Sequence, residues 1–298
     1  MGLKKSGGTS EMGNSKTLAP ALRDLWHVIA ASQEVPMGGR RVTTLFDTGL
    51  TVSRNERLRV ARNDDGTLLP VIERYGCIWT SFGSPSADLF PIIEYGESDR
   101  RNIIAGSIGV NVSAPRAIEN FLDMGHFPYV HTDILGAEPH TEVKEYDVEI
   151  SFERDEILAT RCRFFQPKAA LTATEGQDVD YIYRVPHPYC SVLYKSCPTD
   201  ESRLDVIAIF CQPMTEETIR AHLMLSMIDA DNTDAGIRRF QQTIFGQDRP
   251  ILENQYPKRL PLDPRAETPI RADKSAIAYR RWLSQKGVNY GVIPQQLS

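Results

Sequence analysis

Residues 119–131 read Glu119-Asn120-Phe121-Leu122-Asp123-Met124-Gly125-His126-Phe127-Pro128-Tyr129-Val130-His131. The segment places the imidazoles of His126 and His131 and the carboxylate of Asp123 within nine residues. Neutral imidazole nitrogens suit Fe(II), and two histidines with one carboxylate on one face of the metal leave the remaining positions open for dioxygen. The segment is therefore a candidate iron site.

The spacing of the two histidines differs from that of the common zinc helix. In His-Glu-x-x-His the rings lie four residues apart and share a helical face. His131 follows His126 by five residues, which would leave the rings about 140° apart on a straight helix. Pro128 lies between them, and proline removes a backbone donor and clashes with the preceding turn. We expect a break in the helix at Pro128 to turn both rings toward one metal ion.

Two neighbouring side chains could support this site. A carboxylate at Asp123 can hold the second N–H of the His126 ring and fix its tautomer, which is a supporting role and not a ligand role. The amide of Asn120 could reach a substrate pocket, although a packing or capping role explains it equally well. The alternative for the two histidines is that they are hydrogen-bonded polar groups without a metal.

The pattern Asn-Phe-x-Asp-x-x-His-x4-His resembles the mononuclear iron motif of Rieske-type non-haem iron oxygenases. The resemblance implies that His126 and His131 bind iron and that Asp123 bridges to a neighbouring Rieske cluster. It also implies a third, distant acidic ligand in a helix. Gln247-Asp248-Arg249-Pro250-Ile251-Leu252-Glu253-Asn254-Gln255 is similar to the family's pattern for that helix, which makes Asp248 the predicted third ligand.

Three other acids compete for the role of third ligand: Asp229, Asp231 and Asp234. They cluster where a helix is expected to begin, and acids are favoured there for capping and helix-dipole reasons alone. Asp248 therefore remains the better candidate.

The ligands of a Rieske cluster are missing from these 298 residues. The cluster needs two cysteines and two histidines, which the family carries as Cys-x-His and Cys-x-x-His. Neither pair occurs among Cys77, Cys162, Cys190, Cys197 and Cys211. Residues 22–36 and 71–79 nevertheless resemble the two flanks of a Rieske domain. The resemblance implies a truncated β remnant of that domain at residues 19–83, with no [2Fe-2S] cluster in this chain.

Hydrophobic periodicity predicts the rest of the organisation. Residues 1–18 are rich in Gly, Ser and Lys and are expected to be a disordered tail. Residues 40–83 contain short β-prone runs, with a turn at Asn63-Asp64-Asp65-Gly66. A longer β-prone run at 102–112 leads to Ser113-Ala114-Pro115-Arg116, which is typical of a helix N-cap followed by proline in the first turn.

Successive strands are predicted from Thr141 to Met227, at residues 143–150, 156–165, 180–186, 190–196, 203–212 and 218–227. A helix should follow at 233–256, kinked at Pro250, with a buried side made by Ile237, Phe240, Ile244, Phe245, Ile251 and Leu252. A last helix is expected at 274–286, capped by Asp273 and ended by Gly287. This is an α+β pattern. The resemblance makes residues 84–298 a helix-grip (START-like) catalytic domain, with an antiparallel sheet, a long C-terminal helix and the metal between them.

Composition excludes several classes of function. A hydrophobic content of 41% supports a real core, and a net charge of −5 argues against a surface that neutralises nucleic-acid phosphates. An odd number of scattered cysteines fits reduced thiols in the cytoplasm. There is no apolar run of about 18 residues, so neither a membrane span nor a secretion signal is expected.

The remaining histidines and two tryptophans have simpler interpretations. We expect surface or hydrogen-bonding roles for His27, His140, His187 and His222, because none has a ligand-like partner. Trp79 and Trp282 lie in apolar runs and are predicted core residues. Residues 185–194 and 207–211 are candidate pocket segments by their location alone.

Within the family, the chain resembles oxygenase subunits of bacterial methylxanthine (caffeine) breakdown that lack a Rieske cluster. That resemblance implies an Fe(II)- and O2-dependent monooxygenase that N-demethylates 7-methylxanthine to xanthine and formaldehyde. It implies electrons from NADH through a separate Rieske-bearing reductase, a glutathione-transferase-like structural subunit, and a trimer-based hetero-oligomer. The alternative is a non-catalytic helix-grip protein, either a ligand-binding module or a structural subunit of an oxygenase assembly.

Overall fold

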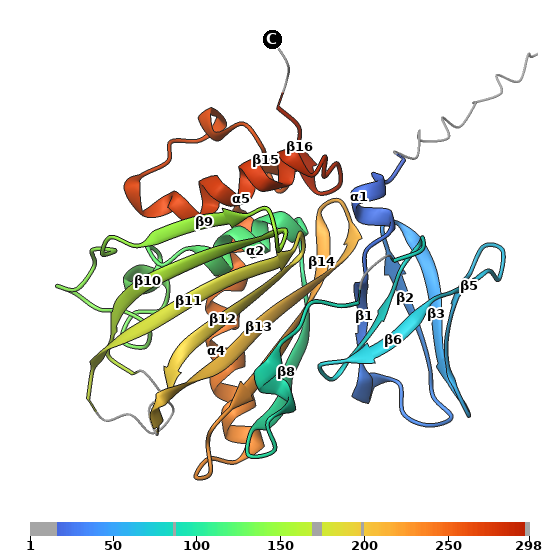
Figure 1. Cartoon of the computed structure of the whole chain (residues 1–298), viewed down its shortest axis with the longest axis horizontal. Helices are drawn as coiled ribbons and strands as arrows, with labels where there is room; N and C mark the ends of the chain where they lie inside the picture. Colours follow the sequence, from blue (N-terminus) through green and yellow to red (C-terminus); the bar gives the residue numbers. More distant parts are fainter. Residues whose placement is uncertain (1–16, 86–87, 169–174, 198–199, 296–298) are drawn as a thin grey trace, which may run out of the picture.

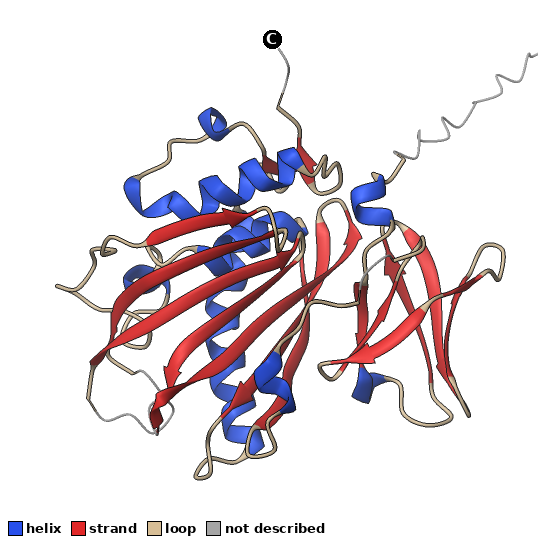
Figure 2. Ribbon diagram, in the orientation of Figure 1, coloured by secondary structure: helices blue, strands red, loops and turns tan. Residues whose placement is uncertain are grey.

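The computed structural model describes residues 17–85, 88–168, 175–197 and 200–295. Except for Thr17 and Leu18, the predicted tail at residues 1–18 lies outside the described residues. Helices and strands occur together in one chain, as Figure 2 shows, and the predicted α+β class is confirmed.

A seven-stranded antiparallel sheet forms the larger part of the molecule (Figure 1). Its strand order is β8-β14-β13-β12-β11-β10-β9, so that all neighbours except β8 and β14 follow each other in the chain. The bounds are β8 (Arg101–Val110), β9 (Asp147–Ser151), β10 (Glu156–Gln166), β11 (Gln177–His187), β12 (Cys190–Cys197), β13 (Asp200–Thr215) and β14 (Thr218–Met227). Sequential antiparallel pairing is what short turn connections between alternating runs produce.

Successive side chains on the central strands point to opposite faces of this sheet. One set packs with Trp79 of the N-terminal part and contains Val192, Ala208 and Met224. The alternate set lines a cavity on the opposite face and contains Leu193, Ile207 and Leu225. Both faces are therefore covered, which explains why β12, β13 and β14 are apolar along most of their length.

The cavity face of the sheet is covered by helices (Figure 1). Helix α4 (Asp234–Asn254) contacts β8 and α2 (Ala114–Leu122), and α5 (Lys274–Gln285) contacts β9 and β10. The Thr233 side chain caps α4 by accepting a hydrogen bond from the backbone N–H of Gly236 at 3.1 Å. No helix in the described part of the chain is long and apolar enough to cross a membrane.

Two details of the predicted helices are wrong. Ile251 was assigned to the buried side of the long helix but is 49% exposed, because its neighbour Leu252 faces the core at that turn. Asp273 precedes α5 without capping it through its side chain. Its carboxylate instead accepts the backbone N–H of Ile270 at 2.7 Å and closes the short turn η4 (Arg271–Asp273).

The break in the ligand segment also lies elsewhere than predicted. Helix α2 ends at Leu122, and α3 (Phe127–Val130) begins directly after His126. Pro128 lies in the first turn of α3, where its missing N–H costs no helical hydrogen bond. The chain therefore turns between Asp123 and His126, before both histidines, and not between them at Pro128.

The N-terminal part consists of two small antiparallel sheets beside the large one (Figure 1). Their orders are β1-β7-β6 and β2-β3-β4-β5, and β1 and β2 contact β13. Trp79 on β7 is fully buried, with its ring 5.0 Å from that of Phe210, and Trp282 is also buried. The bounds are β1 (His27–Ala31), β2 (Arg40–Leu45), β3 (Thr48–Arg54), β4 (Leu58–Arg62), β5 (Leu68–Leu69), β6 (Val71–Arg74) and β7 (Cys77–Thr80).

Short elements complete the chain: α1 (Pro20–Arg23), η1 (Ser32–Glu34), η2 (Ile93–Gly96), η3 (Pro264–Ala266), and the parallel pair β15 (Leu260–Pro261) and β16 (Val292–Ile293).

Buried histidines, among them His27 and His222, make stability depend on pH. Burial lowers the pKa of His27 to about 4 and that of His222 to about 3. Both rings are hydrogen-bonded in the neutral form, His27 to the Leu22 carbonyl at 2.7 Å and His222 to Ser107 at 2.9 Å. Below about pH 6.5 the unfolded chain binds protons that the folded chain does not, so stability is lost as the pH falls toward 4.

We expect each of these two histidines to remove about 2 kcal/mol from the free energy of unfolding between about pH 8 and pH 5. Urea unfolding at a series of pH values measures this slope. His222→Gln should flatten it, whereas His140→Gln should leave it unchanged because His140 is exposed. Equal slopes in wild type and His222→Gln would contradict the assignment.

Candidate metal centre

The two predicted ligand histidines flank the single turn of α3. His126 occupies the position before the helix and His131 the position after it. Their Nε2 atoms lie 3.2 Å apart, and their ring centroids lie 5.1 Å apart. A helix of only four residues therefore brings together two rings that a longer straight helix would separate.

Asp248, from the middle of α4, faces both rings. Its Oδ1 atom lies 3.3 Å from His126 Nε2 and 3.0 Å from His131 Nε2. Each of these three side chains offers one possible metal-ligand atom, and the three atoms all lie within 4.8 Å of one another. The competing acids are engaged elsewhere: Asp234 pairs with Arg101, and Asp229 accepts the backbone N–H groups of Asp231 and Asn232.

The separations of the three atoms fit a bound metal ion. Donors about 2.1 Å from an ion lie about 3.0 Å apart at octahedral angles and about 3.4 Å apart at tetrahedral angles. The three separations here are 3.0, 3.2 and 3.3 Å. Asp248 Oδ1 is buried, and none of the described residues gives it a well-directed hydrogen bond, although both imidazoles touch it. A cation between the three atoms would satisfy that oxygen.

The remaining ring nitrogens are held from behind. Asp123 Oδ2 lies 3.0 Å from His126 Nδ1, and Gln247 Oε1 lies 2.9 Å from His131 Nδ1. Carboxylate and amide oxygens only accept hydrogen bonds, so each Nδ1 carries the hydrogen and each Nε2 is left to face Asp248. Asp123 occupies the supporting position predicted from the sequence, whereas the role of Gln247 is visible only in the structure.

The two carboxylates beside His126 favour positive charge on its imidazole. Burial lowers the pKa of His126, but the contacts of its ring with the carboxylates of Asp123 and Asp248 outweigh burial and raise that pKa to about 9. Burial likewise raises the pKa of Asp248, and its contacts with His126 and His131 reverse this and lower it. The two carboxylates therefore stabilise positive charge at the site, and a divalent cation can supply that charge.

Gln247→Leu is expected to weaken iron binding roughly ten- to hundredfold, because His131 loses the acceptor that fixes its tautomer and orientation. Iron titration of the metal-free chain measures the change. Gln247→Glu keeps an acceptor at the same place and should retain most of the affinity. Wild-type affinity in Gln247→Leu would show that the amide does not orient His131.

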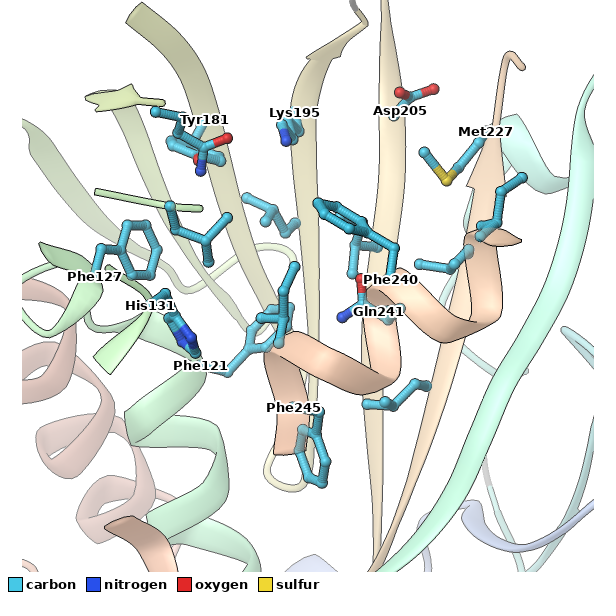
Figure 3. A pocket seen from close by; sticks show the side chains of 18 of the residues that line it. Phe121, Phe127, His131, Tyr181, Lys195, Asp205, Met227, Phe240, Gln241 and Phe245 are labelled. Atoms are coloured by element: carbon cyan, nitrogen blue, oxygen red, sulfur yellow. The ribbon is translucent and has the colours of Figure 1, made fainter. Parts of the chain in front are cut away.

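A cavity of about 140 Å³ opens beside the two histidines, between α4 and the large sheet (Figure 3). Its walls are largely apolar and aromatic, with Phe121, Phe127, Tyr183, Phe240 and Phe245 among the lining residues. Such walls suit a flat molecule of low polarity over much of its area.

The predicted pocket residues contribute only in part to this cavity. Asn120 lies on its wall, as expected for a substrate contact. Of the two segments suggested by location, 185–194 and 207–211, only Leu193 and Ile207 line it. Buried polar side chains at Gln166, Lys195 and Asp205, which no sequence motif indicated, line it as well.

A second hollow lies on the other side of His126. It is lined by Asp123, by Ile251 and Asn254 of α4, and by residues that precede or belong to α5. His126 and Asn120 line both this hollow and the internal cavity. Asp123 therefore stands between the imidazole of His126 and the surface.

Comparisons with known proteins identify the family of this chain. The family profile of the vanillate O-demethylase oxygenase C-terminal domain matches residues 110–287. The probable methylxanthine N7-demethylase NdmC of Pseudomonas sp. (strain TJI-51) is 47% identical over 269 residues, which are 90% of this chain and 95% of that protein. The methylxanthine N1-demethylase NdmA of Pseudomonas putida is 26% identical over 220 residues, with 72% and 59% covered.

Solved structures have the same fold. NdmA of Pseudomonas putida CBB5 superposes with a TM-score of 0.70 at 20% identity, covering 90% of this chain and 91% of that one. Dicamba monooxygenase bound to dicamba gives a TM-score of 0.67 at 17% identity, covering 89% and 97%. Taken with the sequence matches, these findings establish that the chain is an oxidoreductase that belongs to the Rieske-type non-haem iron oxygenases of the vanillate O-demethylase oxygenase C-terminal domain family.

Proposed function

We propose that His126, His131 and Asp248 bind one Fe(II) ion and that this chain is the catalytic subunit of an oxygenase that removes the N7 methyl group of 7-methylxanthine. The observation that carries the proposal is the convergence of three ligand atoms 3.0 to 3.3 Å apart beside an aromatic-walled cavity. The methylxanthine substrate is taken from the relative that shares 47% of its residues.

In the proposed reaction, one oxygen atom of O2 enters a C–H bond of the N-methyl group. The other oxygen leaves as water with two electrons and two protons. The N-hydroxymethyl product then splits into xanthine and formaldehyde. Iron bound at the site would supply the activation of O2, for which three protein ligands leave positions open.

The side chains of the chain orient the reactants. Asp248 balances the charge of the cation, while Asp123 and Gln247 hold the imidazoles in one tautomer. Phe121 and Phe127 lie beside the ligands, with the Phe127 and His131 ring centroids 6.1 Å apart, and exclude water from that end of the cavity. The substrate would lie flat between these rings and the side chains of α4, which decides which methyl group meets the metal.

Electrons have to come from another polypeptide in this proposal, because these 298 residues contain no Rieske ligand pairs. We propose that a Rieske-bearing, NADH-dependent reductase docks over the hollow at Asp123 and passes electrons toward His126. Asp123 is the more exposed residue of the Asp123–His126 pair and lines this hollow, which supports the entry point. A glutathione-transferase-like subunit and a trimer-based assembly remain part of the proposal by family resemblance.

We further propose that residues 19–83 are the remnant of a Rieske domain and that residues 84–298 form the catalytic domain. The two segments that resemble the domain's flanks pair in one sheet, with His27 opposite Thr80 and Val28 opposite Trp79. β2 to β5 form the other small sheet.

Reconstitution of the complete system tests the proposed function. The iron-loaded chain, the reductase, NADH and O2 are incubated with 7-methylxanthine, and xanthine and formaldehyde are quantified. We expect the two products in equal amounts, with about one NADH consumed for each demethylation. Substrate binding without product, in a chain that contains iron and receives electrons, would instead support a non-catalytic role.

A further inference from the structure

A row of polar side chains crosses the sheet wall of the cavity. Tyr181 on β11 is the register partner of Lys195 on β12, and Lys195 is the partner of Asp205 on β13. Figure 3 shows these three side chains along the sheet, set apart from His131. Gln166 at the end of β10 joins the row, because its amide nitrogen donates a hydrogen bond to the Tyr181 hydroxyl.

Gln166 leaves one polar atom without a partner in this buried place. The residue is 1% exposed, and among the described residues none forms a hydrogen bond with its Oε1 atom. An unpaired buried acceptor costs about 1–3 kcal/mol, so such atoms are rare and call for an explanation. Because Gln166 lines the cavity, a ligand that brings an N–H group would supply the missing donor.

Lys195 and Asp205 add charge to the same wall. They are 8% and 2% exposed, and both line the cavity. Asp205 Oδ1 accepts the backbone N–H of Ile228 at 2.9 Å, which fixes its carboxylate beside the lysine's strand. Burial lowers the pKa of Lys195 to about 8, although the charge of Asp205 acts in the opposite direction. The ammonium group carries three N–H donors, which suit a carbonyl oxygen.

Resting on the proposed function, we infer that this wall determines the orientation of the substrate: Gln166 Oε1 accepts a ring N–H, and Lys195 donates to the C2 carbonyl beside it. In 7-methylxanthine the C2 carbonyl lies between two N–H groups on the six-membered ring. The N7 methyl group belongs to the five-membered ring. Holding the C2 edge at the polar row therefore turns the N-methyl side toward the histidines, which lie apart from that row.

Three ligands test the role of Gln166: 7-methylxanthine, 1,7-dimethylxanthine and 3,7-dimethylxanthine. The last two each replace one ring N–H by N–CH3 and keep both carbonyls. Their dissociation constants are measured by calorimetry on the iron-loaded chain without reductase. Wild type should bind 7-methylxanthine at least about tenfold more tightly than one of the two dimethyl compounds, since that one leaves Gln166 without its donor.

Gln166→Met, which removes the amide at similar volume, should lose that preference by weakening 7-methylxanthine and the dimethyl compound that keeps the same ring N–H. Gln166→Glu keeps an acceptor and should retain the preference. Leu225→Val, a change on the same wall without hydrogen-bonding groups, should also retain it. Lys195→Met should weaken all three ligands by roughly tenfold or more and keep their order, because every ligand carries the C2 carbonyl. Iron content and the unfolding midpoint identify variants that fail to fold.

The outcomes separate the inference from the proposed function. If wild type binds 7-methylxanthine but Gln166→Met keeps the wild-type preference, Gln166 does not read the ring N–H. Loss of the preference in Gln166→Glu would show that the amide donates and does not accept. Unchanged affinities in Lys195→Met would show that Lys195 does not donate a hydrogen bond to the C2 carbonyl. If wild type binds none of the three ligands, the proposed methylxanthine substrate itself is wrong.

Discussion

Asp248→Ala is expected to abolish turnover and to reduce bound iron to less than about a tenth of the wild-type content. The substitution removes the carboxylate that faces both imidazoles and leaves two of the three ligand atoms. His126→Ala and His131→Ala should have the same effect. Iron content after anaerobic loading, measured by atomic emission, and formaldehyde release with 7-methylxanthine check the result.

Asp231→Ala is the matched control for this experiment. Asp231 is an exposed acid that lines the same cavity near the start of α4 but lies outside the cluster of ligand atoms. It should keep iron and turnover. The assignment of the third ligand would be wrong if Asp248→Ala behaved like wild type while Asp231→Ala or Asp234→Ala lost both iron and activity.

Asp123→Asn should separate electron delivery from iron binding. The amide preserves the shape beside His126 Nδ1 but removes the charge, so the chain should keep most of its iron and its affinity for substrate. Steady-state turnover should fall roughly a hundredfold, because the carboxylate that links the imidazole to the surface hollow is lost. Stopped-flow measurement of iron oxidation state after mixing with reduced reductase locates the slow step.

A matched substitution on the same hollow is Asn254→Asp, which adds a carboxylate without touching His126. Iron content, and the rate of demethylation once the iron is reduced, should not change in that variant. If Asp123→Asn turned over at the wild-type rate, the carboxylate would have no part in electron delivery. If it lost its iron, its role would be limited to holding His126.

Much of the fold follows from local patterns in the sequence. Alternation from Val143 to Met227 predicted the sheet, and its strands pair in chain order. The helix start at Ser113 was correct to the residue, because a serine cap and a proline in the first turn each satisfy a local requirement. These features depend on neighbours within four residues, which is why a single sequence reveals them.

The parts that the sequence did not reveal depend on distant contacts. Pro128 is a possible helix break between the histidines, but proline also fits the first turn of α3, and the structure has it there. A glutamine on a helix surface has no sequence signature of its own. The role of Gln247 becomes visible only because α4 places its Oε1 atom 2.9 Å from His131 Nδ1. Lys195 and Leu193 both face the cavity from β12. A lysine at a position of the strand that faces the core was the one sign of the polar wall in the sequence.

We propose an oxygenase that binds iron itself and receives electrons from a Rieske cluster on another polypeptide. The most direct test measures formaldehyde release from 7-methylxanthine by the iron-loaded chain with two forms of the reductase, one complete and one whose Rieske domain has been removed. We predict formaldehyde in proportion to bound iron with the complete reductase and none above background with the truncated form. Adding the isolated Rieske domain should restore release. Sustained turnover with the truncated reductase, or turnover that does not depend on bound iron, would contradict the account.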